Sequence, residues 1–168
     1  MKKLMIAALV LTLFATVAQA QETSAADVAL GYSLIQVVDG FGLTANGGSG
    51  STALNINHWL GAVGDFGLYH SAPIASGIAA GTYTFGPRFS YRHWGRLTPF
   101  SQVLIGGVRY SSNGLAFGAG GGADIALDAR GRFALRPQVE YFGFRANGGT
   151  TSTVRVCVGL VFRFGKRS

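Results

Sequence analysis

Charged side chains are scarce in this chain. Aspartate, glutamate, lysine and arginine make up 12% of the 168 residues, and the formal net charge is +7. The basic residues are scattered along the chain and form no patch with interleaved aromatic residues. Because a nucleic-acid-binding surface shows such a patch, we expect no nucleic-acid partner.

Cysteine is almost absent, since Cys157 is the only one. A single thiol cannot form an internal disulfide, so a disulfide framework is excluded. We expect Cys157 to be a small packed residue rather than a reactive thiol. Metal-ligating side chains also never cluster at the spacing of a metal site. The sequence therefore predicts neither a metal nor a cofactor.

Long apolar runs are absent except at the amino terminus. There, Lys2 and Lys3 precede the apolar stretch Leu4–Val17, and Ala18-Gln19-Ala20 has the small-x-small pattern of a cleavage site. This pattern is typical of a secretory signal peptide over residues 1–20, cleaved after Ala20. A membrane anchor is the alternative, but the run is shorter than the ~20 residues that a spanning helix needs.

The remaining domain, residues 21–168, is rich in alternating patterns. Apolar residues alternate with small or polar ones, which is the period of a β-strand. An even number of such segments predicts an all-β fold, an eight-stranded antiparallel up-and-down transmembrane β-barrel. The expected strands are Asp27–Gln36, Leu43–Leu54, Trp59–Tyr69, Tyr83–Arg92, Thr98–Tyr110, Leu115–Leu127, Phe133–Phe144 and Thr153–Phe164. We expect residues 70–81 to form a loop.

The sixth expected strand indicates which face of the barrel is outside. One parity carries large residues such as Leu115 and Phe117, and the other carries Gly118, Gly120 and Gly122. The interior of a small barrel is narrow, so the glycines fit inside and the large residues point outward. An outward apolar band is required in lipid. A water-soluble, lipocalin-like barrel with the opposite orientation is the alternative, and the fifth strand does not sort into two clean faces.

Charged residues on the small-residue face are expected in the lumen, because arginine facing lipid near the midplane costs about 2–4 kcal/mol. Hairpins centred on Asn147-Gly148 and on Arg130 would place Glu140 opposite Arg155 and Asp124 opposite Arg136. Asp65 and Arg88 could pair likewise. We expect these charges to fill the interior and leave no open channel, either gating the barrel or only satisfying one another. The expected network residues are Asp65, Arg88, Asp124, Arg136, Glu140 and Arg155.

Two prolines fit the strand pattern poorly. Pro87 and Pro137 lie inside expected strands, where a missing N–H donor is normally confined to edges or bulges. A closed barrel has no edge. We therefore predict a local bulge at each proline.

Four short segments carry a further pattern: Gly31–Ser33, Trp59–Gly61, Phe85–Tyr91 and Thr98–Phe100. They resemble segments of the OmpA/OmpX-like family of small outer-membrane barrels. The final strand carries Gly159, Phe162 and Phe164, a pattern similar to the carboxy-terminal signal that the outer-membrane assembly machinery reads. This chain departs from the signal by continuing through residues 165–168.

The resemblance implies an integral protein of the bacterial outer membrane with both termini in the periplasm. Its expected partners are outer-membrane lipid, lipopolysaccharide and the assembly machinery, and no partner protein is indicated. The resemblance also implies extracellular loops near Gly40, Ile74, Ser112 and Asn147, with periplasmic turns near His58, Trp94 and Arg130. No peptidoglycan-binding domain is expected after the barrel.

Catalysis has three candidate histidines, His58, His70 and His93. Lipid deacylase barrels carry an Arg-His-x-Ser arrangement, whereas Arg92-His93 is followed here by Trp94-Gly95. A nucleophile also needs a base that a third group orients, and no such set is visible. We therefore expect no enzymatic activity.

Transport is the remaining class of function. Eight strands leave an interior that side chains fill, while open aqueous channels come with ~16 strands. The sequence therefore favours a structural or interaction barrel over a general diffusion pore. A pore of narrow conductance stays open as the alternative.

Overall fold

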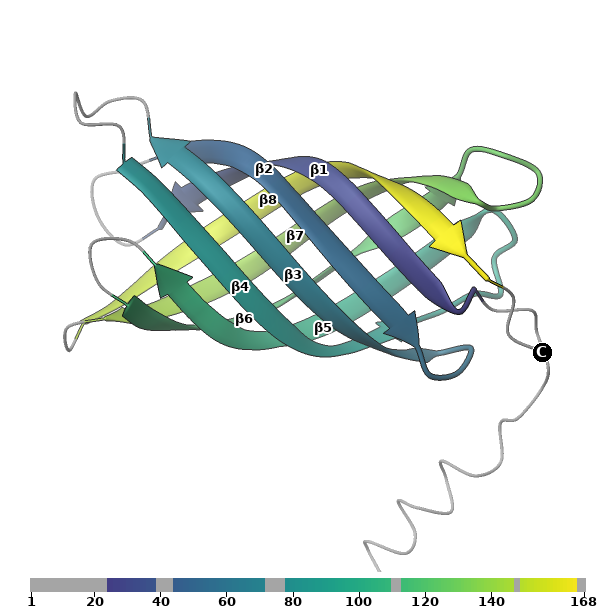
Figure 1. The fold of residues 1–168 in the computed structure, drawn as a ribbon, viewed down its shortest axis with the longest axis horizontal. Helices are drawn as coiled ribbons and strands as arrows, with labels where there is room; N and C mark the ends of the chain where they lie inside the picture. Colours follow the sequence, from purple (N-terminus) through teal and green to yellow (C-terminus); the bar gives the residue numbers. More distant parts are fainter. Residues whose placement is uncertain (1–23, 39–43, 72–77, 110–112, 147–148, 166–168) are drawn as a thin grey trace, which may run out of the picture.

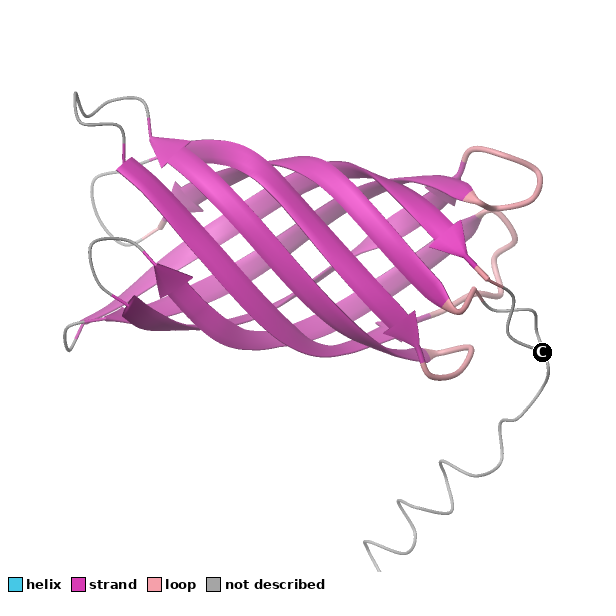
Figure 2. Ribbon diagram, viewed as in Figure 1, coloured by secondary structure: helices cyan, strands magenta, loops and turns pink. Residues whose placement is uncertain are grey.

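The computed structural model describes residues 24–38, 44–71, 78–109, 113–146 and 149–165. The expected signal peptide, the hairpin centre at 147–148 and the final residues 166–168 lie outside these ranges. The strands, shown in Figures 1 and 2, are β1 Ala26–Val37, β2 Thr44–Asn55, β3 Leu60–Ser71, β4 Ile78–Ser90, β5 Leu97–Arg109, β6 Asn113–Ala126, β7 Phe133–Ala146 and β8 Gly149–Phe164. In these ranges, no helix is long and apolar enough to cross a membrane.

The eight strands form a closed barrel in chain order. Each strand pairs antiparallel with the next, and β8 pairs with β1 from Ala26↔Phe164 to Val37↔Thr153. Chain entry and exit lie at one end of the barrel, where the Ala25 backbone N–H donates to the Phe164 carbonyl at 3.0 Å. We call this the terminal end and the opposite end the far end (Figure 1). The predicted fold, an eight-stranded antiparallel barrel, is confirmed.

The predicted connection between the third and fourth strands is too long. The stretch 70–81 was expected to be a loop, but β3 continues to Ser71 and β4 already begins at Ile78. The two strands pair up to Ser71↔Ile78. Small residues in this stretch carry no apolar alternation, so pairing with the neighbouring strand, rather than side-chain pattern, extends β4.

The two faces of the sheet have the predicted polarity. Leu30 is 62% exposed and Leu68 is 75% exposed on the outer surface, while Arg88 and Arg155 are 2% and 1% exposed inside. Burial thus runs opposite to a water-soluble barrel, in which apolar residues face inward. On β5, whose faces were not assigned from sequence, three larger side chains point inward. They are Phe100, Gln102 and Leu104.

Glycines lie opposite aromatic residues at two positions between β6 and β7. Phe117 pairs with Gly143 and, one position along, Gly118 pairs with Phe142. A Cβ atom at Gly143 would lie 2.3 Å from the Phe117 ring, and one at Gly118 would lie 2.6 Å from the Phe142 ring. Each ring therefore lies flat over a glycine, Phe117 on the exposed face and Phe142 on the buried one.

The prolines cause no bulge, which corrects the sequence-based expectation. Register between β4 and β5 is the same on both sides of Pro87, from Phe85↔Ile105 to Arg88↔Gln102. The β6–β7 register likewise continues unchanged past Pro137. A bulge needs an extra residue on one strand, and none is present. Each proline stays paired with one neighbouring strand, Pro87 with Ala62 on β3 and Pro137 with Val158 on β8. The ladder to the other neighbouring strand is interrupted at the proline.

Candidate functional site

Arg155 lies at the centre of the buried polar interior. Its Nε donates to Glu140 Oε2 at 2.6 Å and its second terminal nitrogen also contacts that oxygen. The other terminal nitrogen donates to Asp65 Oδ1 at 2.7 Å and to the Tyr69 hydroxyl at 2.9 Å. All four side chains are almost completely buried. Arg155 therefore joins β8 to its neighbour β7 and, across the lumen, to β3.

Two glutamines extend this cluster. Gln102 Nε2 donates to Glu140 Oε1 at 2.6 Å, and Gln138 Nε2 donates to Glu140 Oε2 at 3.2 Å. Gln102 Oε1 accepts from Arg88 Nε at 2.8 Å. The amide of Gln102 thus connects a buried guanidinium to a buried carboxylate that is already shared with Arg155.

A second cluster lies toward the terminal end. Arg136 binds Asp124 through two parallel hydrogen bonds of 2.6 and 2.8 Å. Arg163 donates to the same carboxylate at 2.9 Å. Two parallel bonds to one carboxylate are the strongest geometry available to a guanidinium. Asp124 is therefore fully engaged by two arginines.

Aromatic rings lie between the charges. The guanidinium carbons of Arg88 and Arg136 lie 4.5 and 4.9 Å from the centroid of the Phe100 ring. Arg155 lies 4.9 Å from the centroid of the Phe142 ring. A cation over an aromatic face within about 6 Å is attracted to it. Phe100 thus links the two clusters, and we call the whole set, with both rings, the lumen network.

The structure brings most of the expected network residues together. Glu140 contacts Arg155, its register partner on the adjacent strand, and Asp124 contacts Arg136. Asp65 does not pair with Arg88, which corrects that expectation. Asp65 is in register with Thr84, whereas Arg88 is in register with Gly61.

Sequence reasoning missed four polar members of the network and both of its aromatic rings. Tyr69 shares parity with Asp65 on β3, so it could have been placed in the lumen. Gln102 stayed unassigned because its parity on β5 also carries Phe100 and Leu104. The remaining two were on the inward face, but their contacts were not anticipated; they are Gln138 and Arg163.

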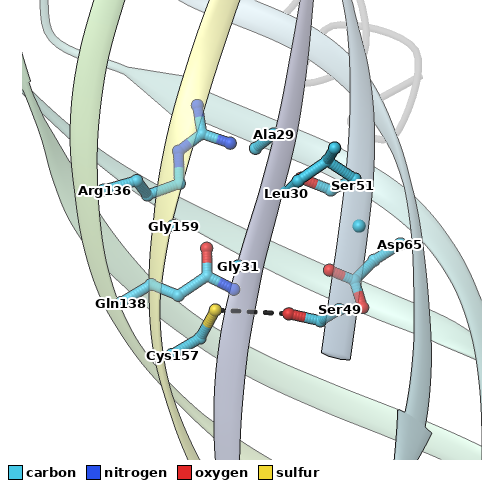
Figure 3. Close-up of a pocket in the computed structure, with 11 residues that line it drawn as sticks. Ala29, Leu30, Gly31, Ser49, Ser51, Asp65, Arg136, Gln138, Cys157 and Gly159 are labelled. Carbon is cyan, nitrogen blue, oxygen red and sulfur yellow. Dashed lines mark hydrogen bonds between the residues drawn. The ribbon is translucent and has the colours of Figure 1, made fainter. Parts of the chain in front are cut away.

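Little space is left beside the network. A cavity of ≈ 10 Å³ lies between Asp65, Arg136, Gln138 and Cys157 (Figure 3). Such a volume holds about one water molecule. The Cys157 thiol lies 3.3 Å from the Ser49 hydroxyl at the edge of this cavity. Cys157 is thus a packed, buried side chain, as predicted.

The terminal end is more open. A cavity of ≈ 1120 Å³ there is lined by basic residues that include Arg92 and Arg163 and by aromatic residues that include Phe133. Arg92 donates to the His58 carbonyl at 2.8 Å and to Asn55 Oδ1 at 3.0 Å, and it lies 3.8 Å from Asp27. Burial lowers the pKa of Arg92, while the negative charge of Asp27 opposes this shift.

The candidate histidines do not form a catalytic set. His70 is exposed on the outer face of β3, and His93 is exposed beside the Tyr91 ring at 4.9 Å. His58 lies in the β2–β3 turn at the opposite end of the barrel from His70. Within the described part of the chain, no group of three or more His, Cys, Asp or Glu could hold a metal ion.

The expected assembly-signal residues lie on β8 next to the seam of the barrel. A Cβ atom at Gly159 would lie 2.8 Å from the Leu30 carbonyl oxygen, so glycine permits the close approach of β1. The Phe162 ring packs edge-on against Phe133 at 5.4 Å. Phe164 is 55% exposed on the outer surface.

The sequence matches no protein-family model and no curated protein. Its fold is nevertheless similar to those of solved outer-membrane barrels. Neisserial surface protein A aligns with a TM-score of 0.70 at 11% identity, over 86% of this chain and 100% of that one. Ail, the attachment invasion locus protein of Yersinia pestis, aligns with a TM-score of 0.57 at 18% identity, over 84% and 100% of the two chains.

A third structure gives the same result. The outer membrane protein OprG from Pseudomonas aeruginosa aligns with a TM-score of 0.57 at 9% identity, over 87% of this chain and 99% of that one. At such low identities the likeness is one of fold. Each of the three chains is covered almost completely, so the similarity extends over the whole barrel.

Proposed function

We propose that this protein is a structural or interaction barrel integrated in the bacterial outer membrane, with its lumen closed by the lumen network and with no catalytic activity. The observation that carries the proposal is the polarity of the barrel. Phe66 and Phe85 are each 63% exposed outside, while the carboxylates and guanidinia of the network are buried inside. Lipid outside the barrel removes the cost of exposing these rings to water.

The terminal end carries the aromatic residues of a membrane–water interface. Aromatic rings gather on the outside at the terminal end, as in the Trp59–Phe89 and Tyr91–Trp94 pairs. Aromatic residues favour the membrane–water interface because one part of the ring system is apolar and another is polar. Aromatic girdles flank both interfaces of a barrel, so the side is taken from the resemblance to small outer-membrane barrels. On that basis we place the terminal end in the periplasm, after removal of residues 1–20. Gly159, Phe162 and Phe164 would then be read by the assembly machinery there.

The packing of the interior favours a closed lumen over a pore. Glu140 on β7 binds both Arg155 on the adjacent β8 and Gln102 on β5, which is not adjacent, and the neighbouring cavity holds about one water. A narrow conductance would require Arg155 to leave both of its carboxylates. Catalysis finds no support, because His70 and His93 lie apart on the outside and no ion pair among the described residues joins either of them to an acid.

The first experiment is heat modifiability of the mature protein folded in detergent, compared on a denaturing gel with and without boiling. A closed membrane barrel gives a mobility shift that boiling abolishes and a β-rich circular dichroism spectrum. Monomeric solubility in plain buffer without a shift would contradict the membrane proposal.

The closed lumen has its own test, the reaction of Cys157 with a water-soluble maleimide. Cys157 faces the lumen and is 6% exposed, so it should resist modification in the folded barrel and react once boiled. Conductance of proteoliposomes would be measured in parallel. Rapid labelling of the folded protein together with a steady ion conductance would favour the narrow pore.

A further inference from the structure

Two arginines break the rule that charges face the lumen. Arg109 ends β5 and has the outward parity of Val103 and Ile105. Arg145 lies near the end of β7 and has the outward parity of Val139 and Tyr141. Among the described strand residues, Arg109 and Arg145 are the only charged residues on the outer face, with histidine taken as neutral. Both lie at the far end of the barrel.

The two arginines flank one strand. Arg109 is in register with Asn113 on β6, and Arg145 is in register with Leu115 on the other side of that strand. Neighbouring strands lie about 4.8 Å apart and each residue rises about 3.4 Å, so the two Cα atoms lie roughly 12 Å apart. The guanidinium groups can therefore contact two separate anionic groups of one molecule.

Within the described ranges, nothing neutralises these cations. The acidic side chains on strands, Asp27, Asp65, Asp124 and Glu140, are all buried in the lumen. No described ion pair includes Arg109 or Arg145. An outward arginine costs little near the interface but about 2–4 kcal/mol at the midplane, which fits the position of both residues at the barrel end.

The surface between the arginines and the middle of the barrel is apolar. Leu115 and Phe117 on β6 are 64% and 49% exposed, and Tyr141 on the neighbouring β7 is 51% exposed. Tyr83 on β4 is 53% exposed, and its ring lies over Gly107 of β5, the other neighbour of β6. Two cations above an apolar strip match an amphipathic ligand with anionic headgroups and acyl chains. A phospholipid offers one phosphate, whereas the lipid anchor of lipopolysaccharide offers two on one disaccharide.

We propose that Arg109 and Arg145 form a binding site for lipopolysaccharide, each guanidinium contacting one phosphate of the bisphosphorylated disaccharide, with the acyl chains packed on Leu115 and Phe117. This inference rests on the proposed function, since it requires the far end to face the lipopolysaccharide leaflet. Guanidinium and phosphate form strong two-pronged hydrogen bonds, which supports arginine at both positions.

The test is native mass spectrometry of the full mature barrel released from detergent micelles containing a defined lipid. The lipids are bisphosphorylated lipid A, monophosphorylated lipid A and phosphatidylglycerol. The variant is Arg109→Gln/Arg145→Gln. The matched control is Arg96→Gln/Arg132→Gln, which removes two exposed charges at the terminal end.

Arg109→Gln/Arg145→Gln should bind bisphosphorylated lipid A at least about tenfold more weakly than the wild type, because two charge-assisted contacts are lost. The control should change by less than about twofold. Removing one lipid phosphate should weaken binding to the wild type but hardly affect the variant.

Three results would overturn the site. The variant could bind lipid A as the wild type does, both double variants could lose affinity equally, or phosphatidylglycerol could bind the wild type as tightly as lipid A. The last result would assign the arginines to phospholipid. If the double variant does not fold, Arg109→Gln and Arg145→Gln are measured singly, and unchanged affinity in both would be equally decisive.

Heat modifiability of every sample separates this proposal from the preceding one. Loss of the mobility shift in the wild type would defeat the membrane barrel itself. A normal shift with unchanged lipid A affinity in the variant would defeat only the arginine site.

Discussion

At the scale of single residues, Arg155 binds side chains from two other strands of the barrel. It contacts Glu140, Asp65 and Tyr69 within a fully buried setting. A buried charge that loses its partner is far more costly than the net gain of the intact pair. The stability of the lumen network therefore depends on its members being present together.

Replacing Arg155 by glutamine should destabilise the barrel strongly. Asp65 would lose its ion pair and Glu140 would keep only amide donors, so the free energy of unfolding should fall by about 3–5 kcal/mol. Urea unfolding of the protein in lipid vesicles, followed by fluorescence of Trp59 and Trp94, measures this change. The control is the triple variant Asp65→Asn/Glu140→Gln/Arg155→Met, which removes the charges together and should lose less. A single variant as stable as the wild type would contradict the prediction.

The residues of this interior could be predicted from sequence only in part. Parity placed Asp65, Arg136 and Arg155 in the lumen, and hairpin centres indicated the contacts between neighbouring strands. The Asp65–Arg155 contact lies across the lumen between β3 and β8, and turn geometry says nothing about strands that are not adjacent. The sequence therefore suggested Arg88 as the partner of Asp65. In the structure Arg88 instead donates a hydrogen bond to Gln102 and lies over the Phe100 ring.

At the scale of the element, β6 depends on its glycines. Gly120 faces the lumen opposite Glu140, and a Cβ atom there would lie 2.3 Å from the Val139 carbonyl oxygen and 2.6 Å from the Glu140 Cα. Backbone atoms cannot move aside as a flexible side chain can. The strand must therefore be small at this position for β6 and β7 to pair.

Gly120→Ala should lower the free energy of unfolding by about 1–3 kcal/mol through overpacking. Gly64 on β3 is the matched control, since a Cβ atom there meets nothing within 4 Å. Gly64→Ala should leave stability unchanged or slightly raised, because alanine reduces the entropy of the unfolded chain. Unfolding midpoints of the two variants in the same detergent decide the matter, and equal midpoints would refute the steric explanation.

The β6–β7 turn carries a pH-dependent contact. The Phe133 backbone N–H donates to Asp128 Oδ1 at 2.9 Å, and this hydrogen bond holds the pKa of Asp128 below its ordinary value. Because the pKa is lower in the folded state, the contact stabilises the fold above about pH 4 and its contribution is lost as pH falls through the folded pKa.

Comparison of the wild type with Asp128→Asn shows this effect, because asparagine cannot titrate. The stability difference between the two proteins should shrink on going from about pH 6 to about pH 3. Thermal unfolding in detergent at both pH values measures the difference. A difference that stays constant would mean that the Asp128 carboxylate adds nothing to the turn.

The sequence predicted that each of the eight strands exists. The strand ends and the course of the chain at the prolines depend on pairing between strands, which the sequence does not show. Alternation in β6 and β8 sufficed to identify both strands and their faces. The start of β4 was missed because Ile78–Gly81 joins the sheet through backbone pairing with β3. The prediction of bulges at Pro87 and Pro137 was wrong. One absent N–H donor interrupts the hydrogen-bond ladder between two strands but does not shift their register.

At the scale of the whole molecule, the barrel has charged side chains inside and large apolar side chains outside, the reverse of a water-soluble protein. Its buried carboxylates each bind a donor inside, and its apolar side chains need an apolar medium outside. This arrangement makes the cost of a surface charge depend on depth in the membrane rather than on exposure alone.

Replacing either of two equally exposed valines by arginine tests whether the cost of a surface charge depends on its depth in the membrane. Val103 lies in the middle of β5 and is 55% exposed, and Val38 lies just beyond β1 and is 57% exposed. Val103→Arg should lower the free energy of unfolding in lipid vesicles by about 2–4 kcal/mol, and Val38→Arg by about 0–1 kcal/mol. Equal, small effects in both variants would indicate a barrel surrounded by water.

The β1–β8 seam couples the order of synthesis to the order of folding. Ala26 and Phe164 pair although almost the entire described chain separates them. Contacts of such sequence separation form late, because the loop-closure entropy must be overcome before they stabilise anything. A chain that lacks its last strand has two unsatisfied edges, so closure must wait until β8 is in place. The adjacent entry and exit points also make the barrel a natural candidate for circular permutation.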